Sequence, residues 1–399
     1  MENLYLPEST APRFGVYVHI PFCTSRCGYC DFNTYVPGPA GTPEAYLDSL
    51  AREFELVAEG KASEVLVGAG AVSDWGSADT VFIGGGTPSL MGAGGLATIL
   101  DAIRETFGLS PHAEVTTECN PESTSPEFFE GLREAGYTRI SLGMQSTASH
   151  VLKVLERAHR PGRALEAAHE AKAAGFDHIN LDMIYGTPTE TRDDVKATVD
   201  AMLSTPIDHV SAYSLIVEDG TAMARKVNKG QYRITDEDEL AWRYEYIDAQ
   251  LADAGFHWYE VSNWSKPGGE CRHNMGYWQN FHWWGFGPGA HSHIGNQRFA
   301  NTKLPRNYGA RLEEGHLPID MVETLTPEDT YLENLMLGLR LHQGIDESIL
   351  NPAALPTVEG FIRRGLLERF AIGDQKRIRV TSEGRLLADG IITDIGMMQ

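Results

Sequence analysis

The sequence is strongly acidic, and this charge limits what the protein can bind. Its 399 residues include 33 Lys and Arg against 55 Asp and Glu, a formal net charge of −22, which argues against nonspecific binding to nucleic acid or anionic lipid. No apolar run approaches the roughly 18 residues of a membrane-spanning helix, and the first residues carry no basic, apolar leader. We therefore expect a cytoplasmic protein without an integral membrane segment, built as a large domain plus a smaller one.

Six short β-rich segments recur in the first half of the chain, and each is followed by a helical pattern. The predicted strands cover residues 14–20, 79–85, 113–119, 139–145, 178–184 and 209–215, and the predicted helices cover 43–58, 95–107, 125–135, 161–174 and 190–204. After a longer first interval the strands start 26 to 39 residues apart, which suits one strand plus one crossover helix. Six parallel β/α units favour an open or partial barrel over a closed barrel of eight units.

Beyond about residue 300 the pattern changes. Residues 326–341 and 356–369 are predicted to be amphipathic helices, and 377–395 a strand, a turn and a final helix. Helices followed by a small β-ribbon indicate a winged-helix-like domain. The acidic balance and the few basic residues of this tail favour a lid or scaffold over DNA binding. We divide the chain into a barrel over 1–230, a barrel extension over 231–310 and a C-terminal domain over 311–399.

Three of the five cysteines lie within eight residues, in HIPFCTSRCGYCDFN. This odd, clustered set does not make a disulfide framework. Structural zinc usually takes four ligands, often from two C-x2-C pairs, and the chain has no second pair. A [4Fe–4S] cluster has four iron corners, each usually held by a thiolate, so Cys23, Cys27 and Cys30 would leave one iron open. Cys119 and Cys271 are alternative fourth ligands, although buried packing is the commoner role of a lone cysteine.

The spacing C-x3-C-x2-C after a first strand, with Tyr29 before the last cysteine, resembles the radical S-adenosylmethionine (SAM) superfamily. The resemblance implies an α/β fold: a partial (β/α)6 barrel, here followed by a small α+β, winged-helix-like C-terminal domain. It also implies a [4Fe–4S] cluster whose open iron is chelated by the amine and carboxylate of SAM. An electron from such a cluster cleaves SAM to a 5'-deoxyadenosyl radical.

A glycine-rich segment, GGGTP, closes the second predicted strand. It lacks the Lys-Ser/Thr of a phosphate loop and the G-x-G-x-x-G spacing of a dinucleotide fold. Glycines let the backbone approach a ligand closely, although a tight turn between strand and helix is an equal reading of this segment alone. The resemblance implies that Gly85, Gly86 and Thr87 touch the methionine part of SAM.

Polar residues stand at or near the ends of the third, fourth and fifth predicted strands. In a β/α barrel these ends converge on the mouth that also receives the cysteine loop. In the branch of the superfamily that resembles coproporphyrinogen oxidase, matching positions bind the ribose and adenine of SAM, together with an arginine twelve residues after the glutamine. The resemblance therefore implies SAM contacts from Glu118, Gln145, Asp182 and Arg157, and Tyr17 also fits the pattern of the branch.

Three features separate the oxidases of this branch from its HemW family of heme chaperones. Asp31-Phe32 follows the cysteines where the oxidases have Gly-Cys, and only 22 residues precede Cys23, too few for the long substrate-binding arm of the oxidases. The third feature lies in residues 271–292, which resemble the H-N-x-x-Y-W signature associated with heme binding in HemW. Its residues here are His273, Asn274, Tyr277 and Trp278.

A histidine can ligate heme iron while Tyr and Trp stack on the flat porphyrin, which gives this signature a physical basis. An aromatic-rich segment that covers the open side of the barrel is the alternative interpretation. His282, His291 and His293 are rival axial ligands. Cys271 lacks the second cysteine of a c-type attachment site, so no covalent heme bond is predicted.

Two functions of different classes follow. The leading hypothesis is a heme chaperone with one [4Fe–4S] cluster and SAM, which passes heme to acceptor hemoproteins such as respiratory cytochromes. The alternative is an oxygen-independent coproporphyrinogen III oxidase of porphyrin biosynthesis, and another radical-SAM activity such as methyl transfer is a third possibility. The sequence leaves open whether SAM is cleaved, which residues would be catalytic, and the oligomeric state.

Overall fold

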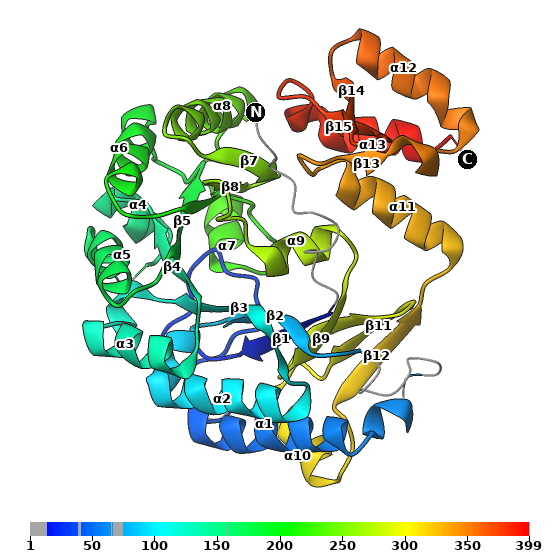
Figure 1. Cartoon of the computed structure of the whole chain (residues 1–399). Coiled ribbons are helices and arrows are strands. Elements are labelled where there is room, and N and C mark those ends of the chain that lie inside the picture. Colours follow the sequence, from blue (N-terminus) through cyan, green and yellow to red (C-terminus); the bar gives the residue numbers. More distant parts are fainter. Residues whose placement is uncertain (1–13, 39–40, 65, 67–74, 158, 399) are drawn as a thin grey trace.

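Six parallel strands form the centre of the structure, a computed structural model that describes residues 14–38, 41–64, 66, 75–157 and 159–398 (Figure 1). The N-terminal segment used to predict the location lies outside the described residues. The strands lie in chain order, each parallel to its neighbour, which confirms the expected partial barrel. They are β1 (Phe14–Ile20), β2 (Ala78–Gly85), β3 (Leu109–Cys119), β4 (Arg139–Gln145), β5 (His178–Tyr185) and β6 (His209–Ser214).

Helices cover the outer face of these strands (Figure 1). Several begin where a side chain can satisfy free backbone N–H groups: Thr42 accepts from Ala45, Ser125 accepts from Phe128, and Thr191 forms a capping box. The helices that connect the strands are α1 (Pro43–Ala58), α2 (Gly92–Thr106), α3 (Pro126–Ala135), α4 (Ser149–Val154), α5 (Arg163–Ala173) and α6 (Arg192–Leu203). They are followed by α7 (Ala222–Asn228) and α8 (Glu237–Asp253).

Short strands extend the sheet at both edges. The full order is β12-β11-β10-β9-β1-β2-β3-β4-β5-β6-β8-β7, in which β9 is parallel to β1 and the outer strands are antiparallel to their neighbours. Because β12 belongs to this sheet, the sheet continues past residue 310, and the three-part domain division stays a prediction. The added elements are β7 (His257–Glu260), β8 (Asn263–Ser265), α9 (Arg272–Trp278), β9 (His282–Phe286), β10 (His291–Ile294), β11 (Gln297–Asn301), α10 (Pro305–Glu313) and β12 (Ile319–Thr324).

The C-terminal domain combines helices with a separate antiparallel sheet of order β13-β15-β14. The helix expected over 356–369 ends earlier, because Gly365 has φ +73° and the Leu366 N–H bonds back to the carbonyl of Phe361. The chain then turns into β14. The elements are α11 (Pro327–Gly338), β13 (Ile345–Asp346), α12 (Leu355–Arg363), β14 (Leu367–Ile372), β15 (Gln375–Val380) and α13 (Ala388–Gly396).

The parallel strands divide into an apolar and a polar face. Residues such as Val81, Ile140 and Leu181 are fully buried in the main core, toward the helices. Side chains of strands alternate between faces, so the intervening residues point to the inside of the barrel. In β3 to β6 many of these are polar, which leaves the inner face free to build a site. No helix among the described residues is long and apolar enough to cross a membrane.

Candidate functional site

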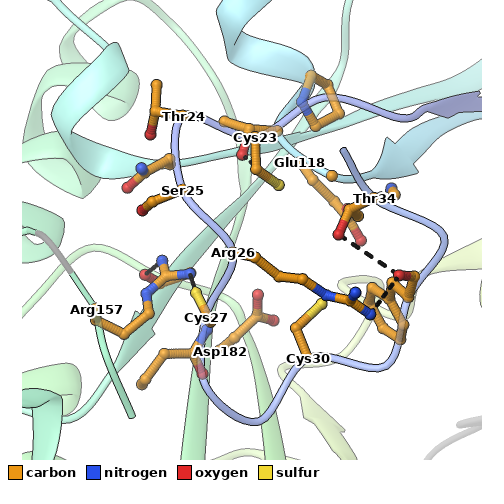
Figure 2. A pocket seen from close by; sticks show the side chains of 18 of the residues that line it. Cys23, Thr24, Ser25, Arg26, Cys27, Cys30, Thr34, Glu118, Arg157 and Asp182 are labelled. Atoms are coloured by element: carbon orange, nitrogen blue, oxygen red, sulfur yellow. Dashed lines mark hydrogen bonds between the residues drawn. The ribbon is translucent and has the colours of Figure 1, made fainter. Parts of the chain in front are cut away.

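The predicted cysteine loop and SAM residues meet at the mouth of the barrel. A cavity of about 160 Å³ is lined by residues from the loop after β1 and from the ends of β2 to β5 (Figure 2). In the figure the three cysteines surround a common space, with Arg157 beside Cys27. The predicted residues that line it are Cys23, Cys27, Tyr29, Cys30, Gly85, Gly86, Thr87, Glu118, Gln145, Arg157 and Asp182.

The cysteine loop is held in place by backbone hydrogen bonds to distant segments. The N–H of Gly28 donates to the carbonyl of Leu155 at 3.3 Å, and the Gly28 carbonyl accepts from Met223 of α7 at 2.8 Å. Within the loop itself, the N–H of Cys23 donates to the carbonyl of Tyr35 at 3.0 Å. The loop is therefore fixed to the polypeptide independently of its thiols.

All five cysteines are free of disulfides, as the sequence predicts. The Thr87 hydroxyl donates to Cys23 Sγ at 3.4 Å, and Arg157 Nη1 donates to Cys27 Sγ at 3.7 Å. Burial raises the pKa of Cys23, and the bond from Thr87 opposes that rise. Among the described residues no three Cys, His, Asp or Glu are spaced around a single-ion site. Three thiols facing one cavity nevertheless supply the donor chemistry that an iron–sulfur cluster needs.

The glycines after β2 let that strand end close against the cysteine loop. A Cβ on Gly86 would lie 2.5 Å from the Phe22 carbonyl oxygen, and a Cβ on Gly85 would lie 2.6 Å from the His19 ring. Gly85 also has φ +111°, which favours glycine. Its N–H donates to Glu118 Oε2 at 3.0 Å. The GGGTP segment thus joins β1, β2 and β3 at the cavity.

Two carboxyl groups with raised pKa values face the cavity. Burial, and then the nearby Asp182 carboxylate, raise the pKa of Glu118 to about 8. Burial raises the pKa of Asp182 to about 6, although Asn180 donates to it at 2.6 Å. A cationic ligand would favour the charged forms of both groups, and SAM carries a sulfonium cation. The electrostatics of the cavity therefore fit SAM.

Gln145 and Arg157 also line the cavity. Gln145 has φ +67°, an uncommon backbone conformation for a residue with a side chain. Its buried Oε1 has no hydrogen-bond partner in the described structure, so an acceptor is available to a ligand. Arg157 Nη2 donates to the carbonyl of Gly143 at 2.9 Å, which holds the guanidinium between β4 and the loop.

Tyr17 is the one predicted SAM residue that does not line the cavity. His19 Nε2 donates to the Asn33 carbonyl at 3.0 Å, and its Nδ1 accepts from the Tyr17 hydroxyl at 3.0 Å. Tyr17 therefore acts on the loop through His19 in this conformation. Tyr29, by contrast, lines the cavity and packs against a small cluster around Val151 and Leu155.

A second cavity of about 250 Å³ continues the first one into the barrel, and sequence reasoning missed most of its lining. The two cavities share Tyr29, Phe32, Glu118, Ser141, Gln145 and Asp182. Polar side chains on the inner face of β4 to β6 add Arg139, Asn180, His209 and Ser211. The sequence does carry a signal for this cavity, because polar residues occupy alternate positions in these strands. A strand that is buried on both faces would be apolar at nearly every position.

The H-N-x-x-Y-W segment forms α9 and is anchored in the protein interior. His273 is fully buried, and its Nδ1 shares a hydrogen bond of 2.8 Å with Thr80 of β2. Its Nε2 shares a hydrogen bond of 2.8 Å with the Tyr277 hydroxyl. Burial lowers the pKa of His273 to about 3, so the ring is neutral. Neither ring nitrogen is free to bind iron in this conformation.

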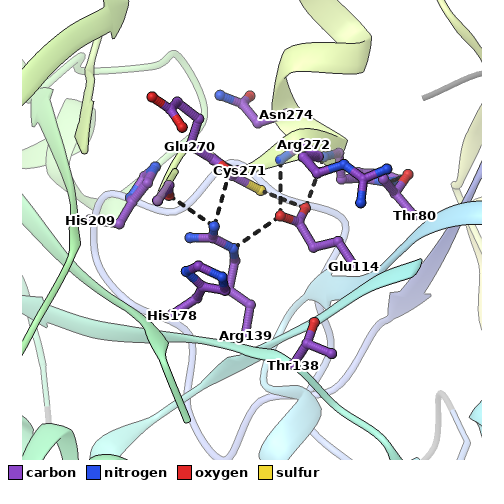
Figure 3. A network of polar contacts seen from close by, with 12 residues as sticks. Thr80, Glu114, Thr138, Arg139, His178, His209, Glu270, Cys271, Arg272 and Asn274 are labelled. Carbon is purple, nitrogen blue, oxygen red and sulfur yellow. Dashed lines mark hydrogen bonds and ion pairs between the residues drawn. The ribbon is translucent and has the colours of Figure 1, made fainter. Parts of the chain in front are cut away.

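The remaining residues of the segment are also held by the protein. Asn274 donates to Glu260 Oε1 at 3.1 Å, and Trp278 packs against the cluster of Tyr259, Met275 and Leu341. Glu114 fastens the start of α9 by accepting from the backbone N–H groups of Arg272 and His273, while Arg139 Nη2 donates to the carbonyls of Gly269 and Glu270 (Figure 3). Buried Cys271 donates to the same Glu114 at 3.5 Å.

The rival histidines lie on the neighbouring strands. His282 and His291 are exposed, whereas His293 is buried, with its ring 5.2 Å from that of Trp283. Cys119 is buried and is among the residues that line the first cavity, with its Sγ toward the Thr117 carbonyl, and burial raises its pKa. The thiols that face the cavity from the loop are those of Cys23, Cys27 and Cys30.

Comparisons with known proteins agree with this geometry. The model of the radical SAM superfamily matches residues 17–202. The chain is 51% identical to the heme chaperone HemW of Mycobacterium tuberculosis over 95% of this chain and 94% of that protein. It is 31% identical to the heme chaperone HemW of Bacillus subtilis, over 94% of this chain and 97% of that protein.

A solved structure shares the fold at low sequence identity. The coproporphyrinogen III oxidase HemN of Escherichia coli, a radical SAM enzyme, superposes with a TM-score of 0.80 at 21% identity, over 98% of this chain and 91% of that chain. The likeness covers both the barrel and the C-terminal domain. From the cysteine loop, the barrel and the extended identity together, the chain belongs to the radical SAM superfamily and, within it, to the HemW family.

Proposed function

We propose that this protein is a heme chaperone, which binds heme and transfers it to acceptor hemoproteins. The observation that carries the proposal is the 51% identity, along nearly the whole chain, to a protein named as a heme chaperone. Asp31-Phe32 after the cysteines is a second support, because the oxidase branch is expected to have Gly-Cys there. Coproporphyrinogen III oxidation remains the alternative that the experiment below tests.

The proposal includes a [4Fe–4S] cluster and SAM in the cavity at the barrel mouth. Cys23, Cys27 and Cys30 would hold the cluster, and Glu118, Gln145, Arg157 and Asp182 would surround SAM together with the Gly85–Thr87 segment. Such a cluster supplies an electron for reductive cleavage of SAM when both are bound. The protein's own part is to fix the loop, orient the carboxylates and keep the polar groups of the cavity available.

The proposal keeps the heme contacts and the acceptors that the sequence predicts. His273, Asn274, Tyr277 and Trp278 stay predicted heme contacts, and iron ligation by His273 would require its hydrogen bonds to Thr80 and Tyr277 to break. Respiratory cytochromes stay the predicted acceptors. The cytoplasmic location also stays a prediction.

One anaerobic experiment separates the two functions. The full chain, with its cluster reconstituted, is given heme or coproporphyrinogen III in parallel, each with SAM and a reductant. We expect a saturable, stoichiometric Soret shift with heme, restoration of a heme-depleted acceptor, and no protoporphyrinogen. Catalytic turnover of coproporphyrinogen would contradict the proposal, and so would the absence of saturable heme binding.

A further inference from the structure

A glycine-rich turn, GFGPG over residues 285–289, packs against β1 and against the cysteine loop that follows it. The turn begins at the end of β9, which lies parallel to β1 in the sheet (Figure 1). A Cβ on Gly287 would lie 2.5 Å from the His19 carbonyl oxygen, and a Cβ on Gly289 would lie 2.6 Å from Asn33 Nδ2. Both glycines have positive φ values, +93° and +78°. The turn therefore approaches the loop more closely than residues with side chains could.

Asn33 fastens the cysteine loop to this turn with its whole side chain. Its Nδ2 donates to the carbonyls of Pro288 and Lys303, both at 2.9 Å. Its Oδ1 accepts from the Tyr35 hydroxyl at 2.9 Å, and its backbone carbonyl accepts from His19 Nε2 at 3.0 Å. Both N–H groups of the amide are therefore used, and their acceptors lie 255 and 270 positions later in the chain.

Cys30 is held differently from the other two cysteines of the loop. Side chains donate to the thiols of Cys23 and Cys27, whereas no side chain among the described residues donates to Cys30 Sγ. The residues that bond to segments outside the loop are Gly28, two positions before Cys30, and Asn33, three positions after it. The position of the Cys30 thiol therefore depends on these two anchors.

We infer that Asn33 and the 285–289 turn position Cys30 for the cluster and so complete the SAM site. The inference rests on the proposed cluster and SAM, and it makes no use of heme. Asn33 is a positioning residue, because it lines neither cavity and acts through Cys30. The open iron is placed by the three thiolates, so a displaced Cys30 changes the contact between that iron and SAM.

This role gives the sheet extension a part in the site. The model of the radical SAM superfamily matches residues 17–202, and the turn and Lys303 both lie beyond that region. The turn is itself fastened to the body of the protein, because the Gly287 N–H donates to Glu53 of α1 at 2.9 Å and the Gly289 N–H donates to the Thr302 carbonyl at 3.1 Å. A fixed turn can hold the loop in one position, which a mobile turn could not do.

The first test is the isosteric variant Asn33→Asp in the full chain with its cluster reconstituted without oxygen. It replaces two N–H donors by a carboxylate oxygen that faces two carbonyl oxygens. We expect SAM affinity, measured by isothermal titration, to fall about tenfold. The electron paramagnetic resonance (EPR) spectrum of the reduced cluster with SAM should also differ from that of the natural sequence. The matched control is Asn280→Asp, whose amide makes an exposed bond to Asn334, and it should change neither measurement.

The second test changes the turn and leaves the loop sequence intact. Gly289→Ala places a Cβ against Asn33 Nδ2, and we expect SAM affinity to fall about threefold. Gly315→Ala is the matched control, because Gly315 has φ +79° and a Cβ there would meet no atom within 4 Å. In an Asn33→Ala background the side chain that the new Cβ would strike is absent, so adding Gly289→Ala should lower SAM affinity no further.

The outcomes separate positioning from a merely structural role and from the proposed cluster. If Asn33→Asp lowers the free energy of unfolding of the cluster-free protein but leaves SAM affinity and the EPR spectrum unchanged, Asn33 is structural only and the inference is wrong. If Asn33→Asp does not fold, Asn33→Ala carries the same test, because it removes the bonds without adding a charge. If the natural sequence takes up no iron, the proposed cluster and the inference fail together. If it holds cluster and SAM, and the variants at both positions match it, the inference alone is wrong.

Discussion

The cysteine loop and α9 were both identified from short motifs, yet they differ in what their side chains do. The loop presents its three thiols to a cavity, with single contacts from Thr87 and Arg157 to two of them. In α9 both ring nitrogens of His273 are already bonded to protein partners. A motif names residue types, but a binding site also needs groups that the protein leaves available. The predictions below test this difference.

The largest effect is expected in the loop. Replacing any one of Cys23, Cys27 and Cys30 by Ser should remove the cluster, because three thiolates are the only protein ligands proposed for its four irons. The broad visible absorbance and the bound iron of the reconstituted protein should both fall to background. Cys119→Ser and Cys271→Ser are the controls and should keep the cluster. Loss of the cluster in Cys119→Ser would show that a fourth thiolate is required.

In α9 we expect a loss of stability instead of a specific loss of a ligand. His273→Ala leaves the hydroxyls of Thr80 and Tyr277 buried without their partner, at about 1 to 3 kcal/mol for each group. The free energy of unfolding in urea, measured on the cluster-free protein, should therefore fall by about 2 to 6 kcal/mol. Cys23→Ser in the same cluster-free form should change it by less than about 1 kcal/mol. If His273→Ala left stability unchanged and abolished heme binding, it would be a ligand after all.

A smaller effect concerns pH and the carboxylates that face the cavity. A cation such as SAM binds the ionised carboxylate, and the pKa of Glu118 is raised to about 8 and that of Asp182 to about 6. Below these values each group must release a proton before it can pair with the sulfonium. SAM affinity should therefore rise between pH 6 and pH 8.5, by about tenfold for each pH unit over which one proton is released.

The variant Glu118→Gln should weaken SAM binding at pH 8.5 and flatten this pH profile above pH 6.5. Isothermal titration of the anaerobic, reconstituted protein measures both. Glu156→Gln is a matched control, because Glu156 lines the same cavity but already pairs with Lys226. This variant should leave the slope of SAM affinity against pH unchanged. An unchanged slope in Glu118→Gln would mean that another group carries the pH dependence.

Much of the fold and of the mouth of the barrel could be predicted from the sequence, because the information there is local. Strand β1 has the predicted bounds, since FGVYVHI is apolar and β-branched and ends before a polar loop. The strand ends then place Glu118, Gln145 and Asp182 on one cavity, because parallel strands end on one side of a barrel.

The features that could not be predicted from the sequence depend on contacts between residues far apart in the chain. His273 bonds to Thr80, 193 positions away, and no local pattern reports that its ring is already engaged. The short strands β7 to β12 acquire their conformation by joining an existing sheet, and so periodicity identifies them poorly. The second cavity likewise brings together Asn180, His209 and Asn274, which come from three separate elements of the chain.

The smallest predicted effect belongs to Tyr17, which the family pattern associates with SAM but which does not line the cavity. Its hydroxyl donates to His19, and His19 donates to the Asn33 carbonyl in the cysteine loop. Tyr17→Phe removes one hydrogen bond at a distance from the ligand, so SAM affinity should fall by no more than about threefold. Thr87→Val, which changes the cavity lining itself and removes the bond to Cys23 Sγ, should have the larger effect. If Tyr17→Phe is the more damaging of the two, the tyrosine contacts SAM directly and the loop must move when SAM binds.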